Sequence, residues 1–166
     1  MIVLADGVVS ETRNCDIDFG GKTLTVCSGS GDPDACIIDC GGSSGTPHRG
    51  FRFHNGEGPG AVVQGITIRK LWEGSSTSGG AVRCENQSTP HFVNCVFRSC
   101  YGFYGGAVAA DYSRPRLERC LLVCDRGVVG SGLYAVNHSW PYLTNCTIAA
   151  DTNQTGAGAA MQAGSN

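Results

Sequence analysis

The sequence predicts an all-β fold, a single-stranded right-handed parallel β-helix of about five coils of 25–26 residues each. Two sets of short motifs recur in step along the chain at this interval, and no segment between them is long or periodic enough for a helix. The 25 glycines are spread over the whole length, which indicates frequent turns between short strands. A repeat of this size cannot bury its own apolar face, so neighbouring repeats must stack.

The first motif contains a proline followed five residues later by a cysteine. The prolines are Pro90, Pro115 and Pro141, and the cysteines are Cys95, Cys120 and Cys146. Apolar residues on either side of each cysteine are expected inside the coil: Phe92, Phe97, Leu117, Leu122, Leu143 and Ile148. The alternation of inward and outward side chains shifts by one residue at each cysteine, because the cysteine also points inward. A tight bend at Asn94, Arg119 and Asn145 explains the slip, since Asn tolerates the left-handed conformation that such a bend uses.

The second motif is a glycine-rich strip that begins at residues 79, 105, 130 and 156. Strand alternation after the glycines predicts which side chains point inward. These are Val82, Cys84, Val108, Ala110, Leu133, Ala135, Ala159 and Met161. The residues between them are expected on the outside of one parallel sheet.

Upstream of residue 79 the repeat is looser. Segments 50–53 and 65–68 resemble the glycine and cysteine motifs, with Ile66 in the cysteine position. We therefore predict one domain over 1–166, with an irregular first coil or N-terminal cap in 1–45 and regular coils in 46–166, the last of them incomplete. An incomplete last coil leaves an open strand edge, which predicts a homo-oligomer formed through the C-terminal coil. A strictly monomeric species at high concentration contradicts this prediction.

The ten cysteines are many for a chain of 166 residues. Cys95, Cys120 and Cys146 are expected to form an internal ladder with a spacing of about 4.8 Å, the distance between strands. A stack of three cannot pair completely, so we expect reduced core thiols in this column. The N-terminal Cys27, Cys36 and Cys40, and the pair Cys100 and Cys124, are better placed for disulfides.

Composition excludes several functional classes. Charged residues make up 16% of the chain and its net charge is −2, without a cluster of Lys and Arg in the sequence, so we expect no nucleic-acid partner. No apolar run is long enough for a membrane span. Residues 1–6 lack the features of a signal peptide, so the protein is expected in the cytoplasm or follows a removed leader.

Two features carry a family resemblance. The Gly-Gly-Ala-Val motif at 79–82 and 105–108 is similar to the repeats of chlamydial polymorphic outer-membrane proteins. Segments 16–42, 48–51 and 145–148 resemble secreted bacterial β-helix repeat proteins of the pectin lyase-like fold. The resemblance covers nearly all of the chain. It implies the fold and an extracellular or cell-surface location, but no single activity, because the fold carries many.

In pectin lyase-like enzymes the substrate lies along the outer face of one parallel sheet. The corresponding outward positions here are Arg52, Arg83, Ala109, Tyr134 and Ala160, followed by His54, Glu85 and Asp111. Arg52, His54, Arg83 and Glu85 are therefore the catalytic candidates, able to bind a uronate and move a proton. Asp111 and Tyr134 are ligand-binding candidates. Solvated side chains on a coil exterior are the alternative, and the acidic motifs of polygalacturonases are missing.

Asp16 and Asp18 alternate on one predicted strand and are the candidate metal ligands. Two carboxylates supply fewer oxygens than the six to eight that Ca²⁺ takes. We therefore expect no cofactor, with Ca²⁺ as the metal that these residues would suit.

These observations favour a non-enzymatic β-helix module at a surface or in secretion, a binding or self-assembly unit or a piece of a longer repeat array. Its partner would be a polysaccharide or a cell-surface protein, held by outward aromatic side chains. The aromatic candidates are Tyr101, Tyr104, Tyr134, Trp140 and Tyr142. The alternative is a carbohydrate-active enzyme, a polysaccharide lyase, hydrolase or epimerase.

Overall fold

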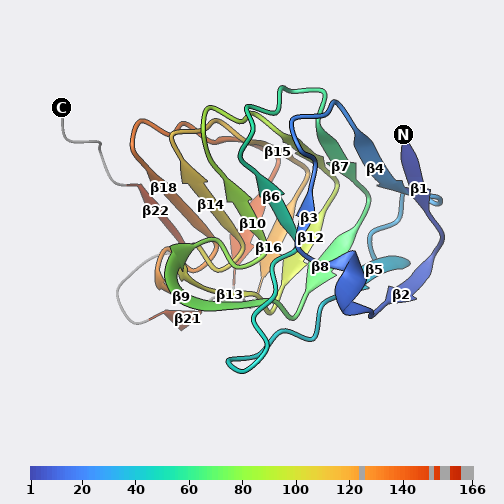
Figure 1. The fold of residues 1–166 in the computed structure, drawn as a ribbon, viewed down its shortest axis with the longest axis horizontal. Coiled ribbons are helices and arrows are strands. Elements are labelled where there is room, and N and C mark those ends of the chain that lie inside the picture. Colours follow the sequence, from blue (N-terminus) through green and yellow to red (C-terminus); the bar gives the residue numbers. More distant parts are fainter. Residues whose placement is uncertain (124–125, 150–151, 154–157, 162–166) are drawn as a thin grey trace.

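The computed structural model describes residues 1–123, 126–149, 152–153 and 158–161. These residues form a parallel β-solenoid of six turns, which confirms the predicted fold class (Figure 1). Three sheets of six strands run along the solenoid, and a fourth sheet has four strands. All strand pairs between successive coils are parallel and in register, apart from one irregularity between β9 and β13.

Each coil contributes one strand to each of the three long sheets. Sheet A contains β1 (Ile2–Leu4), β4 (Thr25–Ser28), β7 (Val62–Gln64), β11 (His91–Val93), β15 (Arg116–Glu118) and β19 (Tyr142–Thr144). Sheet B contains β2 (Gly7–Val9), β5 (Cys36–Asp39), β8 (Thr67–Arg69), β12 (Val96–Arg98), β16 (Leu121–Val123) and β20 (Thr147–Ala149). Sheet C contains β3 (Ile17–Asp18), β6 (Phe51–Phe53), β10 (Val82–Cys84), β14 (Val108–Asp111), β18 (Leu133–Val136) and β22 (Ala159–Met161).

The shorter fourth sheet, sheet D, lies between sheets B and C in the third to sixth coils. It contains β9 (Trp72–Ser78), β13 (Tyr101–Tyr104), β17 (Arg126–Val129) and β21 (Thr152–Asn153). In the first coil the short 3₁₀ helix η1 (Thr12–Asn14) stands in its place.

The core fills the space between the sheets. Phe53 of sheet C meets Phe92 of sheet A edge to face at 5.8 Å, and Phe92 meets Phe97 of sheet B at 5.7 Å. The predicted inward residues of the fourth and fifth coils are buried. In the last coil Leu143 is 37% and Met161 69% exposed, because no further described coil covers them. Residues 162–166, and with them the predicted open C-terminal edge, lie outside the described residues.

The corner between sheets A and B has the predicted left-handed bend in four coils. Gly65, Asn94, Arg119 and Asn145 occupy it with φ angles of 66°, 50°, 53° and 54°. The next residue in each coil points into the core. Ile66, Cys95 and Cys120 are buried there, and Cys146 in the last coil is half-buried.

The three cysteines of this corner are free thiols that bond to backbone carbonyls. The Sγ atom of Cys95 donates to the carbonyl of Val63 at 3.4 Å, and that of Cys120 to Phe92 at 3.5 Å. Each bond therefore reaches the preceding coil, and the ladder is held without a disulfide.

One disulfide, between Cys15 and Cys40, joins the first coil to the second. Of the cysteines predicted to be open to bridging, Cys40 is bonded, whereas Cys27 and Cys36 are free. Cys124 lies outside the described residues, and so does the beginning of the last glycine motif, residues 156–157.

The structure has six coils where the repeat predicts about five. The additional coil is the first, whose strands β1 to β3 carry neither repeat motif. Long connections also hide the period, because Val26 and its partner Val63 are 37 residues apart. Among the described residues no helix is long and apolar enough to cross a membrane.

Candidate functional site

The outer face of sheet C carries the predicted candidates in one row. The row runs through Asp18, Arg52, Arg83, Ala109, Tyr134 and Ala160, which pair strand by strand. Figure 1 shows these strands side by side along the solenoid. The four catalytic candidates therefore lie close together at the N-terminal half of this face.

Those candidates are engaged with one another and with Asp18. Glu85 accepts a bond from Arg52 Nε to its Oε2 atom at 3.2 Å and from Arg83 Nη2 to its Oε1 atom at 2.7 Å. Both carboxylate oxygens of Glu85 are thus held by guanidinium groups. His54 Nε2 lies 2.8 Å from the Oδ2 atom of Asp18.

The metal candidates Asp16 and Asp18 are each paired with a different histidine. Asp16 Oδ2 lies 2.9 Å from His48 Nδ1, and Asp18 Oδ1 accepts from the Gly20 amide at 2.7 Å. Burial alone would raise the pKa of Asp18, but the bonds from His54 and Gly20 outweigh it and hold that pKa below its ordinary value. The described residues include no group of three or more His, Cys, Asp or Glu arranged for a metal ion.

The two ligand-binding candidates on this face have structural neighbours. Tyr134 is 6% exposed and its ring lies 4.9 Å from that of Tyr104. Burial raises the pKa of Tyr134, and Tyr104 and Asp111 add to the effect. Asp111 Oδ1 accepts a bond from Asn137 at 2.9 Å. The polar side chains on the outer face of sheet C therefore mostly form hydrogen bonds and ion pairs with other residues of the protein.

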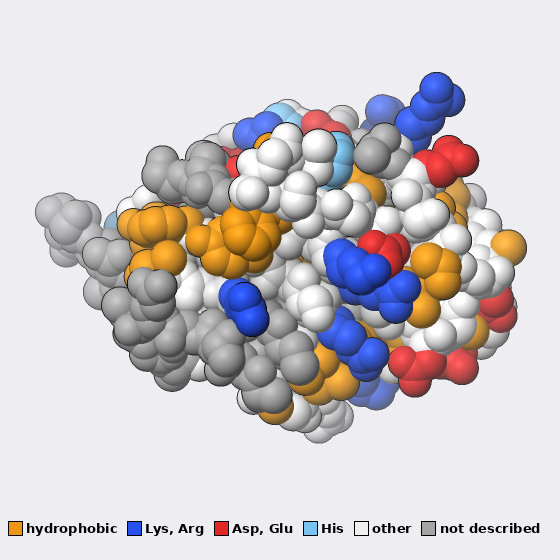
Figure 2. Space-filling model, turned by 90° about the horizontal axis from the view of Figure 1, so that it is seen from below, with side chains coloured by type: hydrophobic (Ala, Val, Ile, Leu, Met, Phe, Trp, Pro, Cys, Tyr) orange, Lys and Arg blue, Asp and Glu red, His pale blue; other side chains and the backbone are white. Residues whose placement is uncertain are grey.

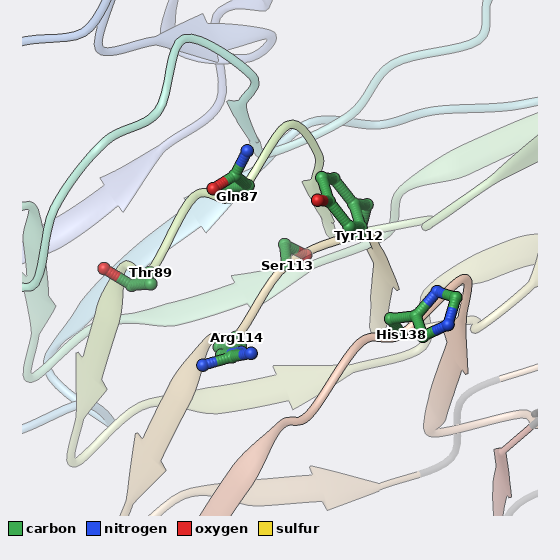
Figure 3. A pocket seen from close by; sticks show the side chains of 6 residues that line it. All are labelled: Gln87, Thr89, Tyr112, Ser113, Arg114 and His138. Carbon is green, nitrogen blue, oxygen red and sulfur yellow. The ribbon is translucent and has the colours of Figure 1, made fainter. Parts of the chain in front are cut away.

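A hollow of about 260 Å³ lies at the corner that leads from sheet C to sheet A. Its lining comes from three successive coils, as Figure 3 shows. Gln87, Tyr112 and His138 have positive φ angles and form one side, and Thr89, Ser113 and Arg114 complete it. All six lining side chains carry hydrogen-bonding groups, and the rings among them are those of Tyr112 and His138.

A larger hollow of about 430 Å³ lies at the corner between sheets B and D, and we call it the corner groove. Lys70 and Ser99 line one side, and Trp72, Tyr101 and Arg126 line the other. The buried residues Leu71 and Cys100 form its floor. Gly41 and Gly42 line it next to β9.

The aromatic side of the corner groove is regular. Trp72, Tyr101 and Arg126 are partners in the ladder of sheet D, so their side chains follow one another along the solenoid. The rings of Trp72 and Tyr101 stack at 4.0 Å with an angle of 17° between their planes. Gly41 and Gly42 place no side chain beside Trp72, and a Cβ atom at Gly41 would find nothing within 4 Å. This leaves an aromatic surface next to basic groups.

Basic side chains gather around the corner groove. Asp39 accepts from Arg69 Nε at 2.8 Å and lies 3.0 Å from Lys70 Nζ. Burial alone would raise the pKa of Asp39, but the bonds from Lys70 and Arg69 outweigh it and lower that pKa. Arg98 is the ladder partner of Arg69 in the next coil. Figure 2 shows Lys and Arg side chains gathered on this face of the molecule.

Sequence reasoning finds Tyr101 but misses the rest of the corner groove. Lys70, Trp72 and Arg126 are far apart in the sequence, and the repeat does not align them directly. β9 is longer than β13, and their register shifts between Gly102 and Tyr104. Aligning the third coil on its corner, Lys70-Leu71-Trp72 against Ser99-Cys100-Tyr101, is the signal that would have found the groove.

Comparison with known proteins identifies no relative of the chain. No family model, no curated protein and no solved structure matches the chain. The resemblance to pectin lyase-like and polymorphic outer-membrane proteins therefore rests on the sequence motifs alone.

Proposed function

We propose that the chain is a non-enzymatic binding module that holds a carbohydrate chain in the corner groove. The observation that carries this proposal is the stacked pair of Trp72 and Tyr101 beside Lys70 and Arg126 in a hollow of about 430 Å³. A sugar ring has an apolar face of C–H groups and a polar rim. An aromatic surface flanked by hydrogen-bond donors complements both.

The pairing on sheet C supports binding rather than chemistry. A carbohydrate-active enzyme needs an acid or base that can exchange a proton with the substrate. Glu85 is held by Arg52 and Arg83, and His54 by Asp18. The enzyme alternative on this face requires these ion pairs to open. The resemblance to pectin lyase-like proteins, and the extracellular location that it implies, fit a saccharide ligand in either case.

The test uses the whole chain with a panel of neutral and uronic-acid polysaccharides, each with and without Ca²⁺. Binding is followed by fluorescence in a Trp140→Phe variant, which leaves Trp72 as the sole tryptophan of the two in the sequence. We expect a change in Trp72 emission without release of shortened or unsaturated products. Tyr101→Ala should weaken binding at least tenfold, because it removes half of the stacked pair.

Glu85→Gln serves as the matched control, since it alters sheet C and leaves the corner groove intact. It should bind like the parent. Product release that disappears in Glu85→Gln would overturn the proposal in favour of the enzyme. Loss of binding in Glu85→Gln with an intact fold would move the site to sheet C.

A further inference from the structure

We infer that the corner groove selects acidic saccharides, chains that carry carboxylate or sulfate groups, over neutral ones. This inference rests on the proposed function and names the ligand class of the same site. Two observations support the inference: the charges around the groove and the spacing of these charges along the solenoid.

The charge around the corner groove is opposite in sign to that of the whole chain. Lys70 and Arg126 line the groove, and Asp39, Arg69 and Arg98 are their charged neighbours on sheet B. Glu73, which follows Trp72, is paired with Arg49. Four basic side chains against one carboxylate leave a net charge of +3, whereas the chain as a whole carries −2. A local excess of this kind attracts anions and disfavours cations.

Three of the four basic groups are available to a ligand. Asp39 has a nearly buried side chain and is shared by Arg69 and Lys70. Arg98 and Arg126 are exposed and have no ion-pair partner among the described residues. Lys70 is 59% exposed, so it can turn from Asp39 to a ligand while Arg69 keeps the carboxylate neutralised. An anion can therefore bind here without leaving a buried charge unpaired.

The spacing of these groups fits a linear polymer better than a small anion. Lys70, Tyr101 and Arg126 belong to three successive coils, so the two cations lie about 10 Å apart along the axis, two strand spacings. Along the axis Tyr101 lies between them, and Trp72 belongs to the same coil as Lys70. A chain of sugar rings can stack on Trp72 and Tyr101 and present an acidic group to each end, whereas one free carboxylate or sulfate reaches a single cation.

The experiment compares three trimers of equal length with the Trp140→Phe protein: galacturonic acid, galactose carrying sulfate esters, and unmodified galactose. We expect at least one acidic trimer to bind about tenfold or more tightly than neutral galactose. The uronate and sulfate arms show which acidic group is preferred. Raising the salt from 50 to 500 mM should remove most of that advantage, because exposed charges are screened.

Two variants test the groove itself. Arg126→Gln removes the unpaired cation that lines the groove. Lys70→Asn removes the second lining cation while keeping a residue that tolerates the φ of 53° found there. Each should weaken binding of the acidic trimer more than binding of the neutral one, so that the preference falls about tenfold, because an ion pair is lost in the first case and a neutral hydrogen bond in the second. Arg114→Gln is the matched control, an exposed arginine in the hollow at the opposite corner.

The outcomes separate the inference from the proposed function. Equal binding of acidic and neutral trimers overturns the inference and leaves the binding module standing. Acidic preference that survives Arg126→Gln and Lys70→Asn but falls in Arg114→Gln also overturns it. No emission change with any saccharide overturns both. Tighter binding of a single-stranded oligonucleotide than of every trimer would replace the saccharide by nucleic acid as the ligand.

Discussion

The buried side chain of Glu57 links the corners of successive coils through hydrogen bonds. Its side chain is 1% exposed and accepts bonds from the Gly21 and Asn55 amides and from the Ser88 hydroxyl, at 2.9 to 3.0 Å. These three donors belong to the corners between sheets C and A of successive coils. Burial alone would raise the pKa of Glu57, but the bonds outweigh it and lower that pKa.

Glu57→Gln should destabilise the protein by about 2 kcal/mol, because the amide group brings donors to positions where donors already point. The pH dependence follows from the lowered pKa. The contribution of Glu57 is complete above its ordinary pKa of about 4.3 and is lost as the pH falls through the lower folded value. Urea unfolding at pH 7 and pH 3 checks this. The difference between parent and variant should shrink at pH 3, and a constant difference would contradict the assignment.

The left-handed corner between sheets A and B contains a position, Arg119, where a substitution should stabilise the protein. Asn94 and Asn145 are residues that favour this conformation, so the sequence predicts it at their positions. Arg119 does not favour it, and only its place in the repeat predicts the bend there. Chiral residues other than Asn and Asp are strained in this conformation. Arg119→Asn should therefore raise the free energy of unfolding by about 0.5–1 kcal/mol, measured as a higher urea midpoint at equal slope.

Arg116→Asn is the control for that prediction. It makes the same chemical change at an exposed position of β15, where the backbone is extended. Asn is disfavoured in strands, so this variant should be neutral or slightly less stable. Equal gains in both variants would mean that loss of positive charge, rather than backbone conformation, is responsible.

At the scale of elements, the turn that enters sheet C explains the recurring glycine motif. Gly79, Gly105 and Gly130 all have positive φ angles there. A Cβ atom at Gly105 would lie 2.3 Å from the carbonyl oxygen of Val108. Gly105→Ala should cost about 3 kcal/mol or more in thermal or urea unfolding. Gly58→Ala, at a site where a Cβ meets nothing within 4 Å, should stay within about 1 kcal/mol of the parent.

The sequence motifs predict sheets A, B and C and the inward residues of the regular coils, because each motif repeats with a constant period. They do not predict sheet D as a separate sheet. Its strands follow no shared motif, and the longer β9 breaks the period just where the corner groove forms. The candidates on sheet C are brought together as the alternation requires. Their mutual ion pairs depend on side-chain geometry across coils that are more than 30 residues apart in sequence.

For the molecule as a whole, the disulfide between Cys15 and Cys40 sets how firmly the first coil is attached. It closes a loop of 25 residues, which in the chain-entropy model contributes about 3.5 kcal/mol. Each coil contacts only its neighbours, so the loss should be local. Reduction should therefore increase hydrogen exchange in β1 to β3 and leave β11 to β16 protected. A Cys15→Ser/Cys40→Ser variant should show the same pattern without reductant, and a uniform increase over all coils would contradict local attachment.

Because successive coils pair in register, gene duplication can lengthen the solenoid by whole coils. The segment that begins at β11 pairs with the one that begins at β15 residue by residue, from His91 opposite Arg116 onward. A recombination event that copies 25 residues here inserts one rung into all four sheets without altering any other rung. It also adds one more copy of Ser99 and Tyr101 to the lining of the corner groove. Under the proposed function, a groove with more coils would hold a longer saccharide chain.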